Sequence, residues 1–135
     1  IAGLDLSPCF YRKALYQKAP LMPEGYMERK LGKGPSVCKE EPFTILLAHS
    51  PLYFDSYARW GADLTLAGHF HGGTIRIPGL GGVMTPQYQF FLPWCAGDFE
   101  RNGKRMIVSR GLGTHSINIR LNNRPQLVLI RLRRA

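Results

Sequence analysis

The sequence predicts an α/β domain with a mixed sheet flanked by helices, and three observations support this class. Residues 44–48 are a continuous apolar run with the length of a strand that is buried on both faces, and residues 63–67 predict a second buried strand. Residues 51–60 between them fit a helix, which gives the strand, helix, strand succession of a parallel α/β sheet. A chain of 135 residues with 44% hydrophobic content is long enough for one domain with one core.

Local sequence signals also predict the secondary structure of residues 1–61. Residues 1–6 predict a short strand, and residues 10–17 could form two helical turns. Residues 18–42 are rich in Lys, Gly, Pro and Glu, which predicts a long surface connection. The helix over 51–60 has defined ends, because Ser50 can cap it, Pro51 suits its first position and Gly61 can adopt the left-handed conformation that stops it.

The second half of the chain contains shorter predicted elements. Residues 74–77 alternate like a strand, residues 78–82 form a turn, and residues 87–94 form an aromatic-rich loop. Residues 104–109 and 126–132 are also expected to be strands. The aromatic loop has two interpretations: it packs into the core, or it forms a lid or shallow membrane contact that accepts a lipid-linked phosphate.

Charge and cysteine usage limit the function classes. The net charge of 18 − 9 = +9 favours phosphate-bearing substrates, nucleic acid or an anionic lipid surface. Cys9, Cys38 and Cys95 are odd in number and lack a C-x-x-C element, so we expect free thiols in a reducing compartment. No apolar run approaches the roughly 18 to 20 residues that cross a bilayer, and the start does not resemble a signal peptide. These features predict a cytoplasmic protein, or one that is peripheral at the membrane or cell envelope.

Three of the four histidines follow the two buried strands. His49 ends the first strand, and His69 and His71 follow the second, at the strand ends where ligands collect in open α/β sheets. If this segment is extended, His69 and His71 project to one side while Phe70 turns into the core. Neutral imidazole is a common ligand of zinc, manganese or iron, so the pattern predicts a metal site. The alternative is that these are ordinary loop histidines whose neighbours satisfy them.

These motifs together resemble a known family. The apolar strand 45–48 followed by His49-Ser50-Pro51, and the strand 62–67 followed by Gly68-His69-Phe70-His71-Gly72-Gly73, are similar to the last two metal motifs of calcineurin-like metallophosphoesterases. Residues 106–114, 117–120 and 127–132 look like the closing strands of a bacterial branch that is commonly envelope-associated. The resemblance departs from the family pattern at Phe70, where Thr is usual, and at Thr74, where Gln is usual.

The resemblance implies a fold, a cofactor and a reaction. The fold would be half of a four-layer α/β/β/α sandwich, with residues 1–135 as the carboxy-terminal part and the amino-terminal half, which supplies the carboxylate ligands, absent. His49 and His69 would bind one divalent ion and His71 a second, the ions being Mn, Zn, Fe or Mg. A metal-activated hydroxide would hydrolyse a phosphate ester or phosphodiester, with a lipid-linked ester as one option. The missing initiating Met and the strand-like start also suggest an upstream segment.

Several alternatives stay open at this point. Arg110 and Arg120 lie near the turn at residues 111–113 and are candidates for binding substrate phosphate, although solvated ion pairs are the commoner role of such side chains. The rival function is a non-catalytic basic module that binds nucleic acid or anionic lipid, but the sequence lacks a nucleic-acid recognition motif. A third possibility is a structural or regulatory half-domain with an exposed sheet edge that pairs with a separate chain.

Overall fold

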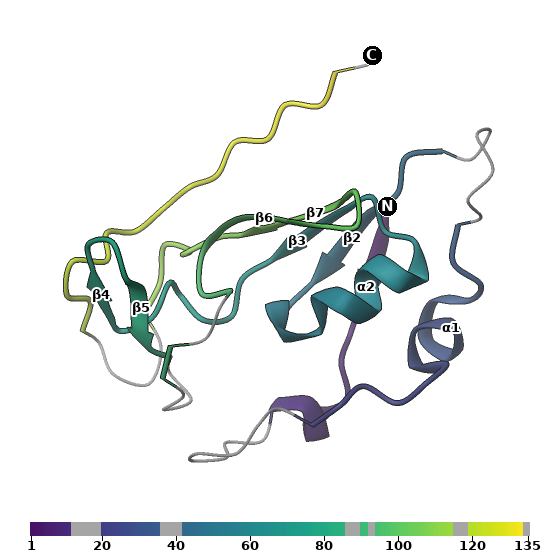
Figure 1. The fold of residues 1–135 in the computed structure, drawn as a ribbon, viewed down its shortest axis with the longest axis horizontal. Coiled ribbons are helices and arrows are strands. Elements are labelled where there is room, and N and C mark those ends of the chain that lie inside the picture. The colour runs from purple at the N-terminus through teal and green to yellow at the C-terminus, as the bar shows by residue number, and fades with distance from the viewer. Residues whose placement is uncertain (12–19, 36–41, 86–89, 92–93, 115–118, 134–135) are drawn as a thin grey trace.

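Seven strands form two sheets in the computed structural model, which describes residues 1–11, 20–35, 42–85, 90–91, 94–114 and 119–133. The larger sheet has the order β1-β2-β3-β7-β6, with β1, β2, β3 and β7 parallel and β6 antiparallel to β7 (Figure 1). A smaller antiparallel sheet pairs β4 with β5. The strands are β1 (Ala2–Leu4), β2 (Ile45–Ala48), β3 (Leu64–Ala67), β4 (Ile75–Ile77), β5 (Gly81–Met84), β6 (Gly97–Arg101) and β7 (Lys104–Val108). This arrangement confirms the predicted α/β class with a mixed sheet.

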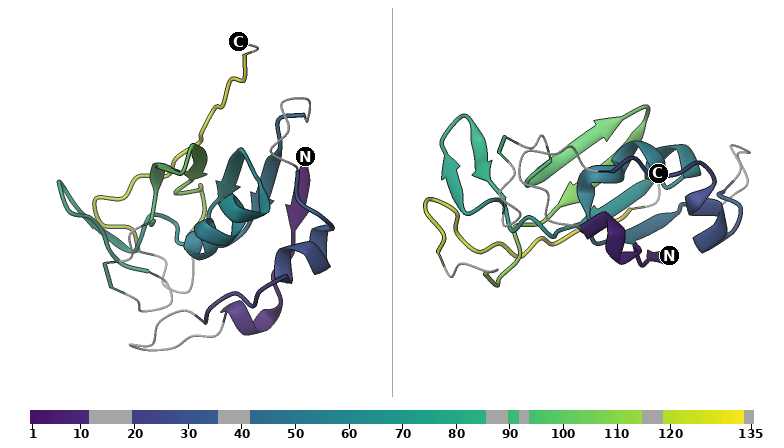
Figure 2. Two further views of the ribbon diagram at one scale, coloured as in Figure 1. Left: turned by 45° about the vertical axis from the view of Figure 1, so that its right-hand side comes forward. Right: turned by 90° about the horizontal axis from the view of Figure 1, so that it is seen from below.

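The helices pack against one face of the larger sheet. They are α1 (Tyr26–Leu31) and α2 (Phe54–Trp60), preceded by the 3-10 turns η1 (Pro8–Tyr11) and η2 (Pro51–Tyr53) (Figure 2). The register aligns Leu46, Thr65 and Met106 across β2, β3 and β7, and all three side chains are fully buried on this face. Tyr57 and Trp60 of α2 join Leu46 in the main apolar cluster.

The opposite face of the sheet is incompletely covered. Leu47 aligns with Gly3 of β1 and Leu66 of β3, and its side chain is 47% exposed. The prediction that residues 44–48 are buried on both faces is therefore only half right. The helices cover the side of β2 that carries Leu46, and Leu47 points to the other side because successive side chains of a strand alternate.

The predicted helix after β2 is confirmed, whereas the predicted connection before β2 contains a helix that the sequence did not suggest. Ser50 Oγ accepts a hydrogen bond from the Leu52 N–H (3.4 Å), and Gly61 ends α2 with a φ of 112°. Within residues 18–42, α1 buries Tyr26 and Met27. Gly25 and Gly32, which favoured a loop, flank this helix instead of interrupting it. Of the helix predicted over 10–17, only its first residues are described, where they belong to η1.

The strands predicted over 74–77 and 104–109 are confirmed as β4 and β7, but β5 and β6 were not predicted and the expected strand over 126–132 is wrong. Residues 119–133 form no named strand, and Leu127 and Leu129 are 84% and 87% exposed. A strand requires a hydrogen-bonding neighbour, and the chain after residue 126 runs away from both sheets (Figure 1). Alternating apolar residues are therefore not sufficient here.

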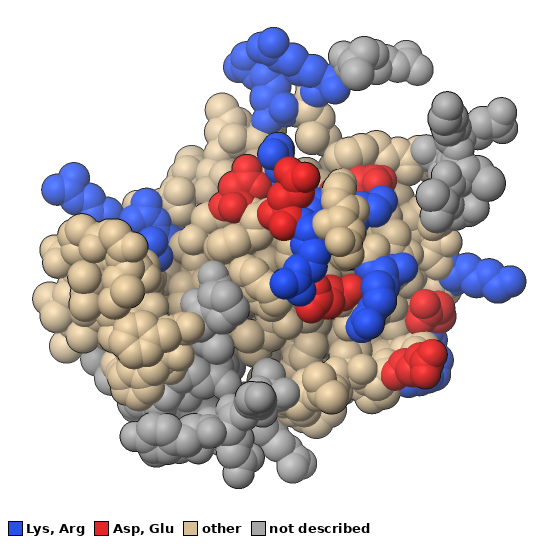
Figure 3. Space-filling view, in the orientation of Figure 1, with Lys and Arg blue, Asp and Glu red and all other residues tan. Residues whose placement is uncertain are grey.

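Charged side chains of both signs are interleaved over β6, β7 and α2 (Figure 3). Arg105 of β7 lies 3.3 Å from Asp98 and 3.8 Å from Glu100 of β6, and Arg101 pairs with Asp55 of α2. These pairs are about half exposed, so each contributes on the order of 0 to 1 kcal/mol.

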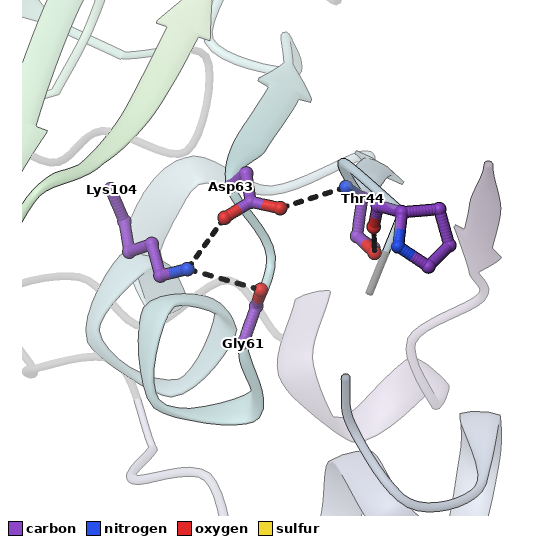
Figure 4. A network of polar contacts seen from close by, with 5 residues as sticks. Thr44, Gly61, Asp63 and Lys104 are labelled. Carbon is purple, nitrogen blue, oxygen red and sulfur yellow. Dashed lines mark hydrogen bonds and ion pairs between the residues drawn. The ribbon is translucent and has the colours of Figure 1, made fainter. Parts of the chain in front are cut away.

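One ion pair joins the beginnings of three parallel strands. Asp63, just before β3, accepts hydrogen bonds from Lys104 Nζ (2.6 Å) at the start of β7 and from the Thr44 N–H (2.8 Å) before β2 (Figure 4). Burial alone would raise the pKa of Asp63, but the hydrogen bonds from Lys104 and Thr44 and the charge of Lys104 outweigh it, so the pKa is lowered. This network aligns the strands at the end of the sheet opposite to the histidines.

Candidate metal centre

The ends of β2 and β3 bring two of the predicted ligands together. Because these strands are adjacent and parallel, both finish at the same edge of the sheet, and His49 follows β2 directly while His69 comes two residues after β3. The Gly68 N–H donates to the His49 carbonyl (3.2 Å), which joins the two turns. His49 Nε2 lies 2.7 Å from His69 Nδ1, with ring centroids 4.5 Å apart. The predicted convergence of these two imidazoles is therefore observed.

The spacing of this pair is suited to a shared cation. Two imidazole nitrogens on one tetrahedral metal are about 3.3 Å apart, from metal–nitrogen distances of ~2.0–2.1 Å. Opening the 2.7 Å contact by roughly half an ångström would reach that value. In the hydrogen-bonded pair, one facing nitrogen carries a proton, and a cation would have to displace it.

Tyr11 supports this histidine pair and was not identified from the sequence. Its ring packs edge-on against His49 at 5.6 Å and against His69 at 5.4 Å between centroids. Burial, and to a lesser degree the charge of Asp5, raises the pKa of the Tyr11 phenol, so the ring remains neutral at physiological pH. The signal that could have found it is its place just after β1, the strand next to β2.

The loop that carries His69 and His71 is not extended, which corrects the geometry expected from the sequence. The φ angles are 68° at His69, 50° at His71, 75° at Gly72 and 86° at Gly73. Left-handed backbone costs a non-glycine residue roughly 1–2 kcal/mol, so neighbouring segments must hold this loop in place. Phe70 is fully buried, as predicted.

His71 makes different contacts from the other two histidines. Its Nδ1 lies 2.9 Å from the Gly113 carbonyl oxygen and 3.4 Å from Arg120 Nη2. A carbonyl can only accept, so the shorter of these contacts favours the tautomer with the proton on Nδ1, in which the lone pair that could bind a metal is on Nε2.

The two candidate substrate arginines border the same loop. Arg120 Nη2 donates to the carbonyl of Arg110 (3.0 Å), to that of Gly111 (3.4 Å) and to that of Gly113. Arg110 Nε donates to Gln126 Oε1 (3.1 Å). Both side chains thus help to fix the turn beside His71, and their predicted contact with substrate stays a prediction.

Asn123 is a residue of the site that sequence reasoning missed. It is 2% exposed, and its Nδ2 donates to the carbonyl of His71 (2.7 Å) and to that of Gly73 (2.5 Å). Nothing in the local pattern of residues 120–126 marks it, because its partners lie about 50 positions earlier.

Carboxylate ligands are not gathered here in the part of the chain that the structure describes. Within those residues, no group of three or more His, Cys, Asp or Glu side chains is placed to hold a metal ion. Asp55, Asp63 and Asp98 form ion pairs with basic side chains. The donor set therefore fits part of a metal site, namely its imidazole ligands.

Comparison with known proteins identifies similar sequences. The chain is 31% identical over 91 residues to the uncharacterized metallophosphoesterase YkuE of Bacillus subtilis. These aligned residues make up 67% of this chain and 31% of YkuE. It is 28% identical over 88 residues to the uncharacterized metallophosphoesterase YkoQ of the same organism (65% and 33%). It is 30% identical over 101 residues to the phosphodiesterase YaeI of Escherichia coli (70% and 36%).

The chain spans about a third of the length of these curated relatives. No family model and no solved structure matches it. YkuE and YkoQ are both named metallophosphoesterases, and the observed α/β fold with its mixed sheet agrees with the fold expected of that family. The chain belongs to the calcineurin-like metallophosphoesterase family.

Proposed function

We propose that this chain contributes the histidine ligands of a dinuclear centre that hydrolyses a phosphate ester or phosphodiester. The observation that carries the proposal is the 2.7 Å contact between His49 Nε2 and His69 Nδ1 at the ends of adjacent parallel strands. These two residues would hold one divalent ion, and His71 would hold the second through Nε2. When bound, such ions polarise phosphoryl oxygens and lower the pKa of a coordinated water toward neutrality.

The remaining ligands would come from an amino-terminal half of the same domain. Two observations support this part of the proposal: the described carboxylates do not gather at the histidines, and the sheet face that carries Leu47 is incompletely covered. A second sheet on that face would bury Leu47 and bring further side chains to the edge where β2 and β3 end.

The residues around His71 would bind and orient the substrate. Arg110 and Arg120 place permanent positive charge beside the candidate metal loop, and Arg120 Nε and Nη1 are buried without a hydrogen-bond partner among the described residues. A phosphate oxygen is a suitable acceptor for guanidinium groups. These arginines would therefore stabilise the negative charge of the ester.

An apolar end of the molecule favours a lipid-linked ester at a membrane surface. Beyond Gly73 the chain enters the β4–β5 hairpin, where Ile77 and Leu80 are 45% and 60% exposed. Phe90 and Phe91 are 49% and 61% exposed, and the Phe91 N–H donates to the Val83 carbonyl (3.0 Å), which places them beside β5. This end shows few charged side chains in Figure 3. We call Ile77, Leu80, Phe90 and Phe91 the apolar tip.

The apolar tip also bears on the two interpretations of the aromatic loop. Trp94 packs on Phe54 at 6.1 Å between ring centroids, as core packing requires, whereas Phe90 and Phe91 face solvent, as a lid or membrane contact requires. Tyr88, Leu92 and Pro93 lie outside the described residues. No helix in the described part of the chain is long and apolar enough to cross a bilayer.

The test is an assay of the full-length protein with Mn²⁺ and an aryl phosphodiester. Wild type should hydrolyse it in a metal-dependent manner, and His69→Ala and His71→Ala should each abolish most of the activity. His115→Ala is the matched control, because His115 has no place in the motif. Equal activity in all four proteins would remove the assignment, and metal-independent, salt-sensitive retention on DNA would support the basic binding module instead.

A further inference from the structure

We propose that Asn123 is a positioning residue that sets the backbone of His71 and thereby the direction of its imidazole. The inference rests on the proposed function in one respect, namely that His71 is a metal ligand. Asn123 would not touch substrate or metal. It would act through the two carbonyl groups that flank Gly72.

The segment that carries Asn123 is joined to the histidine loop by backbone hydrogen bonds. The Leu121 N–H donates to the Thr74 carbonyl (3.0 Å), and the Arg76 N–H donates to the Leu121 carbonyl (3.0 Å). Leu121 also forms an isolated parallel bridge with Ile75. Asn123, two residues later, adds side-chain contacts to His71 and Gly73, so this short segment contacts the chain from His71 to Arg76.

An asparagine is chemically suited to this position. The carbonyls of His71 and Gly73 both require a donor, and the amide nitrogen of Asn carries two N–H groups, so that one atom can satisfy both. An aspartate of the same shape would place a negative oxygen against two carbonyl oxygens. A shorter side chain would leave these carbonyls without that donor in a buried place.

Packing supports the same role. A Cβ added at Gly72 would lie 2.8 Å from Asn123 Oδ1 and 2.6 Å from Arg110 Cγ, so the Asn123 side chain is in close contact with the backbone of the loop. The buried side chain of Asn123 therefore packs against the loop in which His71, Gly72 and Gly73 have left-handed backbone conformations. Such conformations persist only where the surroundings determine them.

Asn123 and Arg120 act on different parts of His71. Asn123 fixes the backbone of His71, and Arg120 fixes the Gly113 carbonyl that lies 2.9 Å from His71 Nδ1. With both in place, the imidazole is oriented with Nδ1 toward the Gly113 carbonyl oxygen. Groups of this kind, one step removed from the metal, typically change metal affinity by roughly 10–100-fold when they are replaced.

The test compares Asn123→Asp with Asn122→Asp in the full-length protein. Asn122 is the adjacent, exposed asparagine with a φ of 52°, so its substitution makes the same change of charge without touching the loop. Amide hydrogen exchange of the metal-free proteins is measured over residues 68–74, and Co²⁺ affinity is measured from its visible absorption. Since a buried carboxylate could unfold the protein, the neutral Asn123→Ala is measured alongside, and exchange in β7 reports whether the fold is retained.

We expect exchange over residues 68–74 to accelerate at least about tenfold in both Asn123 variants, and Co²⁺ affinity to fall by roughly 10–100-fold. Asn122→Asp should match wild type in both measurements. The inference is overturned if Asn123→Asp and Asn122→Asp exchange alike, or if exchange accelerates while Co²⁺ affinity is unchanged. A wild-type protein that binds Co²⁺ but hydrolyses no phosphate ester would count against the proposed function alone.

Discussion

Gly72 is the position where a single methyl group should disturb the candidate centre most. In Gly72→Ala, the backbone would keep a φ of 75°, which costs an alanine roughly 1–2 kcal/mol. The new Cβ would also lie 2.6 Å from Arg110 Cγ and 2.8 Å from Asn123 Oδ1, and overpacking of this kind costs on the order of 1–3 kcal/mol. The Arg110 side chain can move, but Asn123 is buried, so we expect a total loss of about 2–4 kcal/mol.

Gly68→Ala is the matched control for this substitution. It adds the same methyl group to the same loop, but the nearest atom to its Cβ would be the Ser109 carbonyl oxygen at 4.0 Å, and its φ is not in the left-handed region. Urea denaturation of the two full-length variants gives the difference in unfolding free energy, and Mn²⁺-dependent hydrolysis gives the effect on the site. If Gly72→Ala and Gly68→Ala unfold at the same urea concentration, the described packing around the loop is wrong.

Three further predictions follow from other contacts. Asp63→Asn should lower the unfolding free energy by about 0.5–1.5 kcal/mol at pH 7, because it removes the partly exposed Lys104 pair, whereas Asp55→Asn should change little. Folding lowers the pKa of Asp63 from its ordinary value of 3.8, so the stability that its ionised form contributes is fully present above that value. This contribution is lost as the pH falls through the lower pKa of the folded state. The unfolding free energies of wild type and Asp63→Asn should therefore converge below about pH 4. Phe91→Ser should reduce flotation of the protein with anionic vesicles severalfold, while Leu21→Ser, at a leucine outside the apolar tip that is 92% exposed, should not. Equal flotation of the two variants would argue against the apolar tip. His49→Ala and His69→Ala should lower the Co²⁺ binding stoichiometry from two to one if they share an ion, and a stoichiometry of two in either variant would contradict that sharing.

The parts of the fold that sequence reasoning predicted have signals within a few residues. The apolar runs around Leu46 and Leu64 and the cap at Ser50 are of this kind, because burial and capping leave a local pattern of residue types. The meeting of His49 and His69 also followed from sequence, since it needs only two neighbouring parallel strands that end at one edge of a sheet.

The missed features depend on contacts between distant segments. The conformation of the loop at His71 is determined by Asn123 and Arg120, about 50 residues later, and no spacing rule connects them. Helix α1 has only six residues, too few for a clear helical period, and its burial depends on packing against α2 and β1. Strand β6 was missed for a similar reason, because three of its five residues are charged and it is stabilised by pairing with β7.

The error at Leu47 has a physical explanation that supports the proposed second half of the domain. A continuous apolar run is typical of strands with both faces covered, yet Leu47 is 47% exposed while Leu46 beside it is fully buried. Leu127 and Leu129 show the same mismatch, because their spacing is that of a strand but they belong to no strand of either sheet and are 84% and 87% exposed. Both mismatches are resolved if a further sheet covers the Leu47 face and pairs with the segment around Leu127. That sheet would lie beside the edge where His49 and His69 meet, which is where the proposed dinuclear centre would take its carboxylate ligands.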